Sequence, residues 1–221
     1  MTQLQQQDGV YVLTLGDDEN RFTLDWLKQT NAYLDEIVEA PAPLVTTAEG
    51  KFYSNGLDLD YVMSNPDQLT AYVADVQELL ARVLTLPVPT IAAVPGHAFG
   101  AGAMLAMAHD WRIMRSGRGF FCFPEVDIQI PFTTGMAALI QAKLTPQAAV
   151  VAMSTGHRYD ADAAVAAGLI DAAAEEAGLV AAAIAKVQPL AGKDAKTLGA
   201  IKATMYSSVL DELRTPATAG V

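Results

Sequence analysis

Hydrophobic and polar residues follow two periods along the first part of the chain. Residues 9–15 alternate apolar and polar side chains and lead into the polar sequence GDDEN, which predicts a strand that ends in a turn. Residues 23–38 repeat apolar side chains at helical spacing, and Thr23 has the kind of side chain that caps a helix. A short apolar strand is expected at 44–47. A long amphipathic helix is expected at 69–86, where prolines follow.

The second part of the chain continues this alternation. Apolar strands are predicted at 90–94 and 111–114, and residues 100–107 between them predict an apolar helix rich in small side chains. The remainder is largely helical and alanine-rich, and it ends in an amphipathic helix at 198–213. Strands that alternate with helices are typical of an α/β fold.

The 221 residues fit one domain with a short appendage. We expect a core over residues 1–155 and a helical C-terminal region over residues 156–221. The apolar stretch 91–108 has about the length of a membrane span, but Pro95 and Gly96 interrupt it. A buried strand, a sharp turn and a buried helix are therefore the better interpretation.

The charge balance limits the classes of partner. Asp and Glu number 25 against 14 Lys and Arg, which gives a formal net charge of −11. This argues against a nucleic-acid partner, which needs a basic surface, and disfavours an anionic membrane. The single cysteine, Cys122, excludes an intrachain disulfide, and no spacing of Cys and His suggests a metal site. The polar N-terminal sequence and the absence of a peroxisomal signal make a cytoplasmic location the expectation.

Two glycine-containing turns are candidates for binding an oxyanion. The sequence GHAFGAG precedes the apolar helix and is neither a Walker A loop nor a dinucleotide fingerprint, so a helix start with unpaired N–H groups remains. Close helix packing explains its small residues equally well. The sequence SNGLDL forms a second turn, in which Asp58 is more simply a helix cap than a catalytic group. Each turn can supply one N–H to a single oxyanion.

Glu125 is the carboxylate with the most unusual surroundings. It follows the apolar run 120–123, and further apolar residues come after it. Such a carboxylate either caps a helix or acts as a base with a raised pKa, and the residues alone favour capping. The three histidines lie apart from any Ser or Cys motif, so structural roles are expected for them.

Longer segments resemble a known family. The chain contains PVPTIAAVPGHAFGAGAMLAMAHDWRIM, SNGLDL, an FPE segment and HRYDADAAVAAGLID, which together resemble the enoyl-CoA hydratase/isomerase, or crotonase, superfamily. The segments NRFTLDWL, KFYSNGLDLDYV and GRGFFCFPEVDI are most similar to its plant-type Δ3,Δ2-enoyl-CoA isomerases with a single glutamate. The resemblance implies a spiral of ββα turns with a C-terminal helical trimerisation region, and thus a homotrimer or a dimer of trimers.

The resemblance also implies roles for particular residues. The N–H groups of Leu57 and Ala101 would bind the thioester oxygen, and Glu125 would be the catalytic base. Hydratases of this superfamily carry a second glutamate where this chain has Met104, which cannot transfer a proton. One carboxylate suffices to move a double bond, so the substitution favours an isomerase. Two alternatives remain open: a hydratase whose second acid is Asp60 or Asp127, and a catalytically silent acyl-CoA-binding paralogue.

Substrate contacts follow from the same resemblance. Coenzyme A, as part of the substrate, should lie over the SNGLDL turn, and no separate cofactor or metal is expected. The expected substrate-binding residues include two lysines that could contact phosphate, and Lys202 could do so from a neighbouring subunit. The full set is Lys51, Ser54, Gly56, Asp58, Gly100, Met104 and Lys202.

Overall fold

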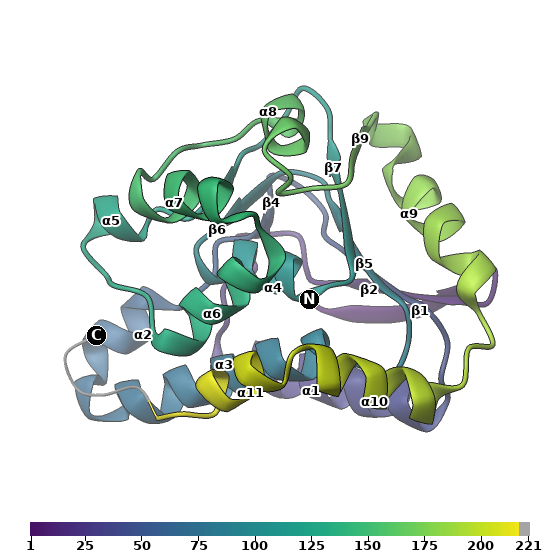
Figure 1. Cartoon of the computed structure of the whole chain (residues 1–221), viewed down its shortest axis with the longest axis horizontal. Coiled ribbons are helices and arrows are strands. Elements are labelled where there is room, and N and C mark those ends of the chain that lie inside the picture. Colours follow the sequence, from purple (N-terminus) through teal and green to yellow (C-terminus); the bar gives the residue numbers. More distant parts are fainter. Residues whose placement is uncertain (217–221) are drawn as a thin grey trace.

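The computed structural model describes residues 1–216, which form two β-sheets surrounded by helices (Figure 1). The larger sheet has the strand order β1-β2-β3-β5-β7-β9, and only the β1–β2 pair is antiparallel. The smaller sheet is parallel, with the order β4-β6-β8. The strands are β1 (Gln3–Gln7), β2 (Val10–Thr14), β3 (Leu44–Thr47), β4 (Phe52–Ser54), β5 (Thr90–Val94), β6 (His97–Phe99), β7 (Trp111–Arg115), β8 (Phe121–Cys122) and β9 (Ala172–Ala174).

The chain alternates between the two sheets. Each of β3, β5 and β7 in the larger sheet is followed by a strand of the smaller sheet and then by a helix. This repeated ββα unit is the spiral that the resemblance implied, and the expected α/β fold class is confirmed. The smaller sheet brings the ends of β4, β6 and β8 side by side, so the turns that follow these strands lie close together.

The helices occupy most of the segments with helical spacing. Thr23 caps α1, accepting a hydrogen bond from the N–H of Trp26 at 3.2 Å. The helix expected at 198–213 is two helices that meet at Tyr206. The α-helices are α1 (Leu24–Glu39), α2 (Leu59–Ser64), α3 (Leu69–Leu84), α4 (Ala101–Ala108), α5 (Glu125–Ile128), α6 (Thr134–Lys143), α7 (Pro146–Ser154), α8 (Ala161–Ala166), α9 (Leu179–Val187), α10 (Ala195–Met205) and α11 (Ser207–Leu213).

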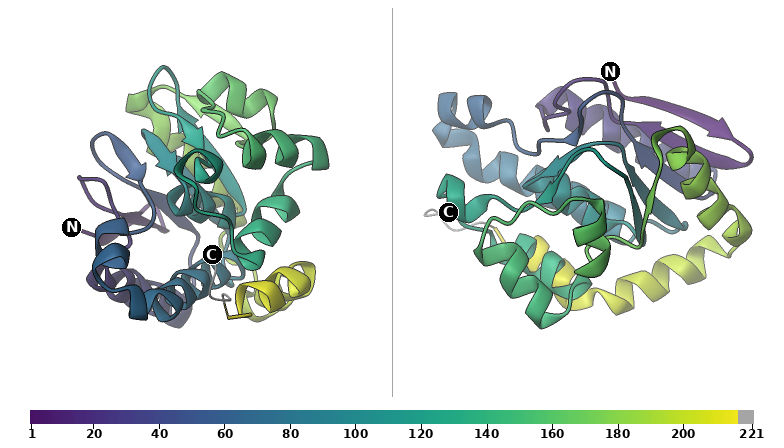
Figure 2. Two further views of the ribbon diagram at one scale, coloured as in Figure 1. Left: turned by 90° about the vertical axis from the view of Figure 1, so that its left-hand side faces the viewer. Right: turned by 90° about the horizontal axis from the view of Figure 1, so that it is seen from above.

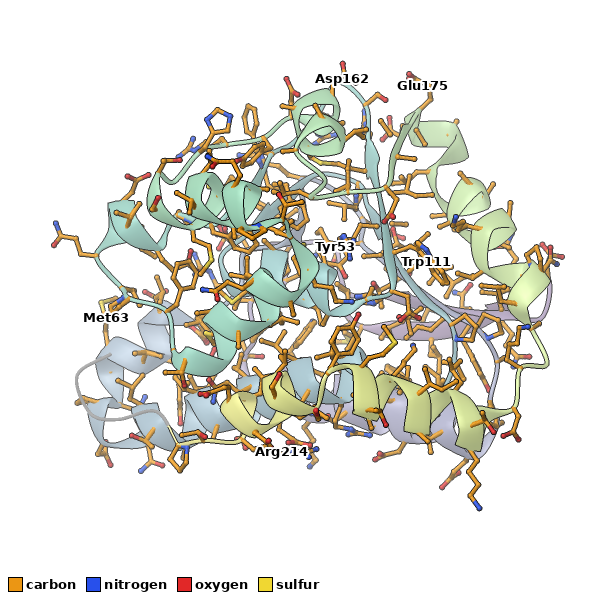
Figure 3. The ribbon with its side chains drawn as sticks, viewed as in Figure 1. Tyr53, Met63, Trp111, Asp162, Glu175 and Arg214 are labelled. Atoms are coloured by element: carbon orange, nitrogen blue, oxygen red, sulfur yellow. The ribbon has the colours of Figure 1, made fainter. Side chains whose placement is uncertain are left out.

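The larger sheet divides the core into two parts. Because side chains alternate along a strand, Ile91 and Ala93 of β5 pack with α9 on one face, and Ala92 and Val94 join the main core on the other. In Figure 1, α9 lies to the right of β5 and β7, whereas α4 and α6 lie to their left, and Figure 2 gives two further views of the same arrangement. Tyr53 lies in the middle of the molecule in Figure 3, fully buried, with its hydroxyl 2.7 Å from Thr46 Oγ1.

The apolar stretch 91–108 folds as the sequence indicated. It forms β5, a turn, β6 and the entirely buried helix α4. Among the described residues, no helix is both long and apolar enough to span a bilayer.

The expected boundary at residue 155 does not coincide with an edge of the core. Tyr159 bridges to Phe121 of β8, and β9 extends the larger sheet beside β7. The helical extension of the described chain begins at α10, whose Lys202 reaches back to the core. Sequence patterns missed this because β9 is a run of three alanines, which carries neither helical nor strand periodicity.

Candidate active site

The N-terminus of α4 provides the first part of the site. Gly100 links β6 to α4 with a φ of +53°, a conformation that glycine adopts without steric cost. Its carbonyl accepts the N–H of Met104 at 3.0 Å. Ala101 is the first residue of the helix, so its N–H has no acceptor within the helix and stands at the positive end of the helix dipole. This N–H is available to an oxygen atom of a ligand.

The turn between β4 and α2 provides the second part. Asn55 donates its N–H to the carbonyl of Glu19 at 2.8 Å, and Gly56 donates its N–H to Ser54 Oγ at 3.0 Å. Within the described part of the chain, the N–H of Leu57 meets no acceptor. The turn therefore leaves one N–H free, next to the start of α4.

Glycines allow this turn and α4 to touch through their backbones. A methyl group added at Gly56, where φ is +77°, would lie 2.8 Å from the Ala101 nitrogen. A methyl group added at Gly102 would overlap the carbonyl oxygen of Ser54. Since neither position tolerates a side chain, the free N–H groups of Leu57 and Ala101 are held close together.

Glu125 brings a carboxylate to the same place. It begins the short helix α5 directly after Pro124, and its side chain is 7% exposed. A methyl group added at Gly100 would lie 3.3 Å from Glu125 Oε1, while Oε2 is buried and has no hydrogen-bond partner among the described residues. Burial raises the pKa of Glu125 to about 7, because desolvation disfavours the charged form. The carboxyl group is thus a base suited to neutral pH.

Two adjoining cavities meet at these groups. The first has a volume of about 330 Å³ and the second of about 270 Å³, and both are lined by Leu57, Ala101 and Glu125. The first is mostly apolar: its other lining residues are Leu59, Val62, Leu69, Thr70, Val73, Met104, Gln129, Ile130, Pro131, Phe132, Thr133 and Met136. The second opens beside two arginines, Arg21 and Arg158.

This arrangement suits proton transfer next to a carbonyl group. A carbonyl oxygen placed between the two free N–H groups would be stabilised as negative charge develops on it. Glu125 would then face the neighbouring carbon atoms, where a desolvated carboxylate removes a proton more readily. No group of three or more metal-ligating side chains occurs in residues 1–216.

Comparison with known proteins supports a family assignment. The family described as enoyl-CoA hydratase/isomerase matches residues 5–219. The chain belongs to the enoyl-CoA hydratase/isomerase family. The superfamily indicated by the sequence segments is therefore confirmed.

Curated relatives of this family member include plant enzymes. Enoyl-CoA delta isomerase 1, peroxisomal, of Arabidopsis thaliana is 38% identical over 179 residues, which cover 78% of this chain and 75% of the relative. Enoyl-CoA delta isomerase 3 of the same plant is 35% identical over 224 residues, covering 96% and 93%. These relatives confirm the expected similarity to plant-type isomerases.

Solved structures of the family have the same fold. A probable enoyl-CoA hydratase of Mycobacterium tuberculosis, EchA3, superposes with a TM-score of 0.90 at 25% identity, covering 97% of this chain and 92% of that one. Human mitochondrial Δ3-Δ2-enoyl-CoA isomerase gives a TM-score of 0.89 at 21% identity, covering 97% and 86%. The second similarity is one of fold alone.

The structure brings several of the predicted site residues together. Leu57, Ala101 and Glu125 line both cavities, Met104 lines the larger one and Gly100 the smaller one. Met104 is 1% exposed, so its thioether is buried at the position where the resemblance implied a second carboxyl group for a hydratase. The structure thus places these residues at one site, and the catalytic and binding roles implied for them stay predictions.

Ser54 and Asp58 have structural partners instead of a place in the cavities, which corrects the expectation that they bind substrate. The Ser54 hydroxyl donates to the carbonyl of Asn20 at 2.7 Å and accepts the N–H of Gly56. Asp58 caps α2 by accepting the N–H of Tyr61 at 3.2 Å. Gly56 likewise serves the packing of the turn on α4. None of the three lines either cavity.

The expectation that Lys202 binds a phosphate is also corrected. Its ammonium group forms a buried ion pair with Asp110 at 2.6 Å and donates to the carbonyl of Val88 at 2.7 Å, so it is not free to bind a phosphate. Its role is to attach α10 to the core. Lys51 is exposed, and its ammonium lies 5.1 Å from the centroid of the Phe52 ring, so its contact with coenzyme A stays a prediction.

The two acids named for a hydratase are not in the site. Asp60 and Asp127 are exposed, and neither lines the cavities. Asp127 instead faces Gly156, where an added methyl group would collide with its carboxylate. The described residues therefore supply one carboxyl group, Glu125, to the cavities.

Sequence reasoning missed four residues that shape the site. The Asn20 amide hydrogen-bonds to β4 just before the turn that carries Leu57, and Tyr72 hydrogen-bonds to the turn itself. Arg21 and Arg158 flank the smaller cavity. The sequence offers little indication of these four residues, because each is distant in sequence from the site residues that it contacts or flanks. The one available hint was the segment NRFTLDWL, which carried part of the family resemblance without suggesting a role for its first two residues.

Proposed function

We propose that this protein is a Δ3,Δ2-enoyl-CoA isomerase, which moves the double bond of a 3-enoyl-CoA to the 2-position. One observation carries the proposal. Among the described residues that line the apolar cavity, Glu125 is the single ionisable side chain, and the same cavity is lined by Leu57 and Ala101, which carry the free N–H groups. The plant relatives named enoyl-CoA delta isomerases support the same activity.

The reaction needs two proton transfers and no further reagent. The thioester oxygen lies between the N–H groups of Leu57 and Ala101. Glu125 removes a proton from C2, and the C–H electrons form a dienolate whose negative charge rests on that oxygen. The protonated Glu125 then returns the proton to C4 as the carbonyl re-forms and the double bond settles between C2 and C3. The enzyme ends in its starting state.

The energetics agree with a mechanism that uses one carboxylate base and two N–H donors. A thioester α-proton is too weakly acidic for an ordinary carboxylate, so the dienolate must be stabilised. An oxyanion donor contributes about 3–4 kcal/mol in enzymes where one has been removed. The pKa of about 7 makes Glu125 a stronger base than an exposed carboxylate while leaving it largely ionised just above neutral pH.

Met104 separates isomerisation from hydration. Hydration requires one group to activate water and another to protonate carbon, and these tasks are usually shared by two carboxyl groups. The buried thioether of Met104 offers water no strong partner, and the cavity is lined mostly by apolar side chains. A silent acyl-CoA-binding protein would have no need of a buried carboxylate whose Oε2 lacks a partner, since burying it is costly.

The two cavities fit the two ends of the substrate. The apolar cavity suits the acyl chain, and the smaller one leads from the thioester past Arg158, which suits the anionic coenzyme A portion. Arg21 also lines the smaller cavity, but its guanidinium is already bound to Glu19 and to the carbonyl of Leu57. Lys51 remains a further proposed contact for its phosphates. Coenzyme A enters as part of the substrate, and the mechanism requires no separate cofactor.

A homotrimer, or a dimer of trimers, is the assembly proposed from the family resemblance. Ile201 and Met205 of α10 support it, because they are apolar and 50% and 65% exposed. Light scattering on the purified protein tests this assembly. A cytoplasmic location likewise stays a prediction, and two of the plant relatives are named as peroxisomal.

The decisive experiment supplies 3-hexenoyl-CoA and follows the conjugated 2-enoyl product. Wild-type protein should form it, and Glu125→Gln should lower kcat by about a hundred- to ten-thousand-fold, the usual contribution of a general base. Glu39→Gln, an exposed position at the end of α1, is the matched control and should keep full activity. Equal rates for wild type and Glu125→Gln would remove the mechanism. Formation of a 3-hydroxyacyl-CoA as the main product would show a hydratase.

A further inference from the structure

Resting on the proposed function, we infer that Asn20 is a positioning residue that fixes the oxyanion donor of Leu57. Asn20 belongs to residues 19–22, called here the strap, which precede α1 and lie against the turn after β4. Neither the cavities nor the reaction touches the Asn20 side chain, so any effect on catalysis passes through the turn.

The strap hydrogen-bonds to every residue from 52 to 57, which are the three residues of β4 and the first three of the turn. The Phe22 N–H donates to the Gly56 carbonyl at 2.8 Å, and the Arg21 guanidinium donates to the Leu57 carbonyl at 3.1 Å. The Glu19 carbonyl accepts the N–H of Asn55, and the Asn20 carbonyl accepts the hydroxyl of Ser54. With these groups paired, the Leu57 N–H is the one left pointing to a ligand.

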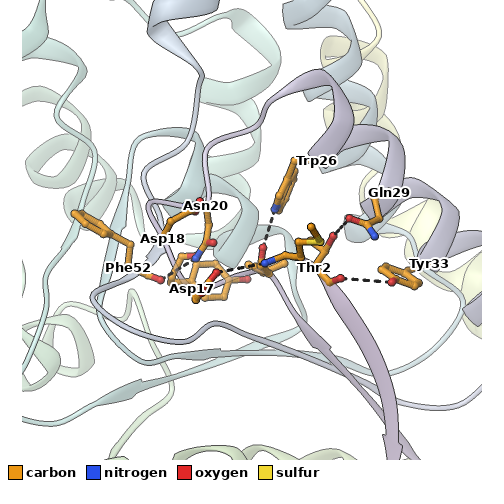
Figure 4. A network of polar contacts seen from close by, with 11 residues as sticks. Thr2, Asp17, Asp18, Asn20, Trp26, Gln29, Tyr33 and Phe52 are labelled. Carbon is orange, nitrogen blue, oxygen red and sulfur yellow. Dashed lines mark hydrogen bonds and ion pairs between the residues drawn. The ribbon is translucent and has the colours of Figure 1, made fainter.

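Asn20 secures the weakest point of this arrangement. Its side-chain amide donates to the carbonyls of Phe52 and Tyr53, each at 3.1 Å (Figure 4). β4 is an edge strand of three residues, and its pairing with β6 is irregular between Phe52 and Ser54. The amide therefore takes the place of a neighbouring strand at the point where the sheet stops defining the backbone.

Placing an asparagine at position 20 costs free energy of folding, which argues against a role in packing alone. The residue is 2% exposed, its φ of +49° is unusual for a residue other than glycine, and its Oδ1 has no partner among the described residues. An apolar side chain or glycine would avoid the unpaired oxygen. Glycine would also relieve the backbone. What only the amide supplies is the pair of donors to β4.

The strap also affects the strength of the donor. The Gly56 carbonyl and the Leu57 N–H belong to one peptide group, and the carbonyl is already hydrogen-bonded to Phe22. Hydrogen bonding at one end of a peptide group polarises the other end. A strap that loosens would therefore both move the Leu57 N–H and weaken it.

Two substitutions at Asn20 test the inference. Asn20→Gly removes the amide and accepts the positive φ. Asn20→Asp keeps the size but replaces the amide nitrogen, which makes both donations, by an oxygen that faces the two carbonyls. We expect kcat to fall by about 10- to 100-fold in Asn20→Gly and further in Asn20→Asp, with KM little changed, because a small displacement of a catalytic group costs about this much. Asn31→Ala is the control, since it loses an amide–carbonyl bond within α1 and a contact with Arg82. It should lower the melting temperature and leave kcat unchanged.

A spectroscopic measurement separates this inference from the proposed function. The carbonyl stretch of bound, isotope-labelled hexanoyl-CoA, which has no double bond to move, reports the hydrogen bonds at the thioester oxygen. Wild type and Asn31→Ala should lower its frequency equally, and both Asn20 variants should bring it nearer to that of free hexanoyl-CoA. An unchanged frequency and kcat in folded Asn20→Gly would overturn the positioning role. A wild type that lowers the frequency without isomerising 3-hexenoyl-CoA would refute the proposed function alone, and the frequency in the variants would still decide the role of Asn20.

Discussion

The two free N–H groups of the site are held in contrasting ways. The N–H of Ala101 is fixed locally, because the next turn of α4 bonds back to Gly100 within four residues. The N–H of Leu57 depends on partners more than thirty positions earlier in the chain and on Tyr72 of α3. A local arrangement can be recognised from sequence and survives distant changes. A long-range arrangement shows little in sequence and is exposed to changes in any of its supports.

The largest loss of activity should come from separating the turn that carries Leu57 from α4, which carries Ala101. In Gly102→Ala the new methyl group would overlap the Ser54 carbonyl oxygen and push the turn away from α4. Helix propensity alone would favour alanine there by about 1 kcal/mol, so a loss of activity would come from the contact. We expect kcat/KM for 3-hexenoyl-CoA to fall about a thousand-fold. Gly178→Ala, where an added methyl meets nothing within 4 Å, is the control. Full activity in folded Gly102→Ala would show that the close approach of turn and helix is unimportant.

A change of pH acts on the base and leaves both N–H donors intact. Because burial raises the pKa of Glu125 to about 7, the active carboxylate is lost as pH falls below this value. We expect kcat/KM to fall about tenfold for each pH unit below 7 and to level off above it. Measured between pH 5 and 9, a profile that stays flat down to pH 5 would show that Glu125 has an ordinary pKa or is not the base. The Asn20 variants should lower this profile without moving its midpoint.

The same pKa predicts a dependence of stability on pH. An acid whose pKa is higher in the folded than in the unfolded state stabilises the fold while it is protonated, and this advantage is lost as pH rises from about 4.5 through about 7. The difference corresponds to about 3 kcal/mol. Glu125→Gln should therefore have a higher free energy of unfolding than wild type at pH 8, by up to this amount, and a similar one at pH 4. Urea unfolding at both pH values checks this, and an equal difference at the two would contradict it.

A smaller loss of activity is expected from removing the hydroxyl of Tyr72, which is a second support of the turn that carries Leu57. The Tyr72 hydroxyl donates to the Phe22 carbonyl at 2.9 Å and accepts the Asp58 N–H at 2.8 Å, so it joins the strap to the far end of the turn. Tyr72→Phe should lower the free energy of unfolding by about 1–2 kcal/mol, because both groups lose a buried partner, and lower kcat about tenfold. Tyr33→Phe serves as the control, because among the described residues the Tyr33 hydroxyl makes a single long hydrogen bond, to the Thr2 carbonyl at 3.5 Å. Loss of stability with unchanged kcat would show that the turn keeps its shape without Tyr72.

The contrast between local and long-range contacts explains what the sequence could reveal. The α/β fold, the strand–turn–helix around Gly100 and the apolar setting of Glu125 follow from neighbouring residues, and the structure contains them. The hydroxyl of Ser54 was misjudged because a turn with a free polar side chain resembles a binding loop until its partner, Asn20, is known.

Two other differences between expectation and structure also arise from long-range contacts. An exposed lysine and a buried one look alike in sequence, so the ion pair of Lys202 with Asp110, 92 positions away, could not be foreseen. The helix predicted at 198–213 bends at Tyr206 because α11 packs against α3 and α6, which tertiary contacts decide and helical spacing does not.

The smallest effect should come from the mouth of the site, where neither N–H donor is involved. Arg158 is exposed, lines the smaller cavity with its guanidinium 5.7 Å from the centroid of the Phe99 ring, and forms no ion pair within residues 1–216. In an acidic chain such a group should attract the phosphates of coenzyme A. Arg158→Gln should raise KM about three- to tenfold at low salt and leave kcat unchanged, and the difference should shrink at high salt because exposed charges are screened. Arg214→Gln, which follows the last residue of α11 and lines neither cavity, should change neither constant (Figure 3). A fall in kcat with unchanged KM would instead connect Arg158 to the geometry of the reacting groups, since it would show that the mouth and the two donors are not independent.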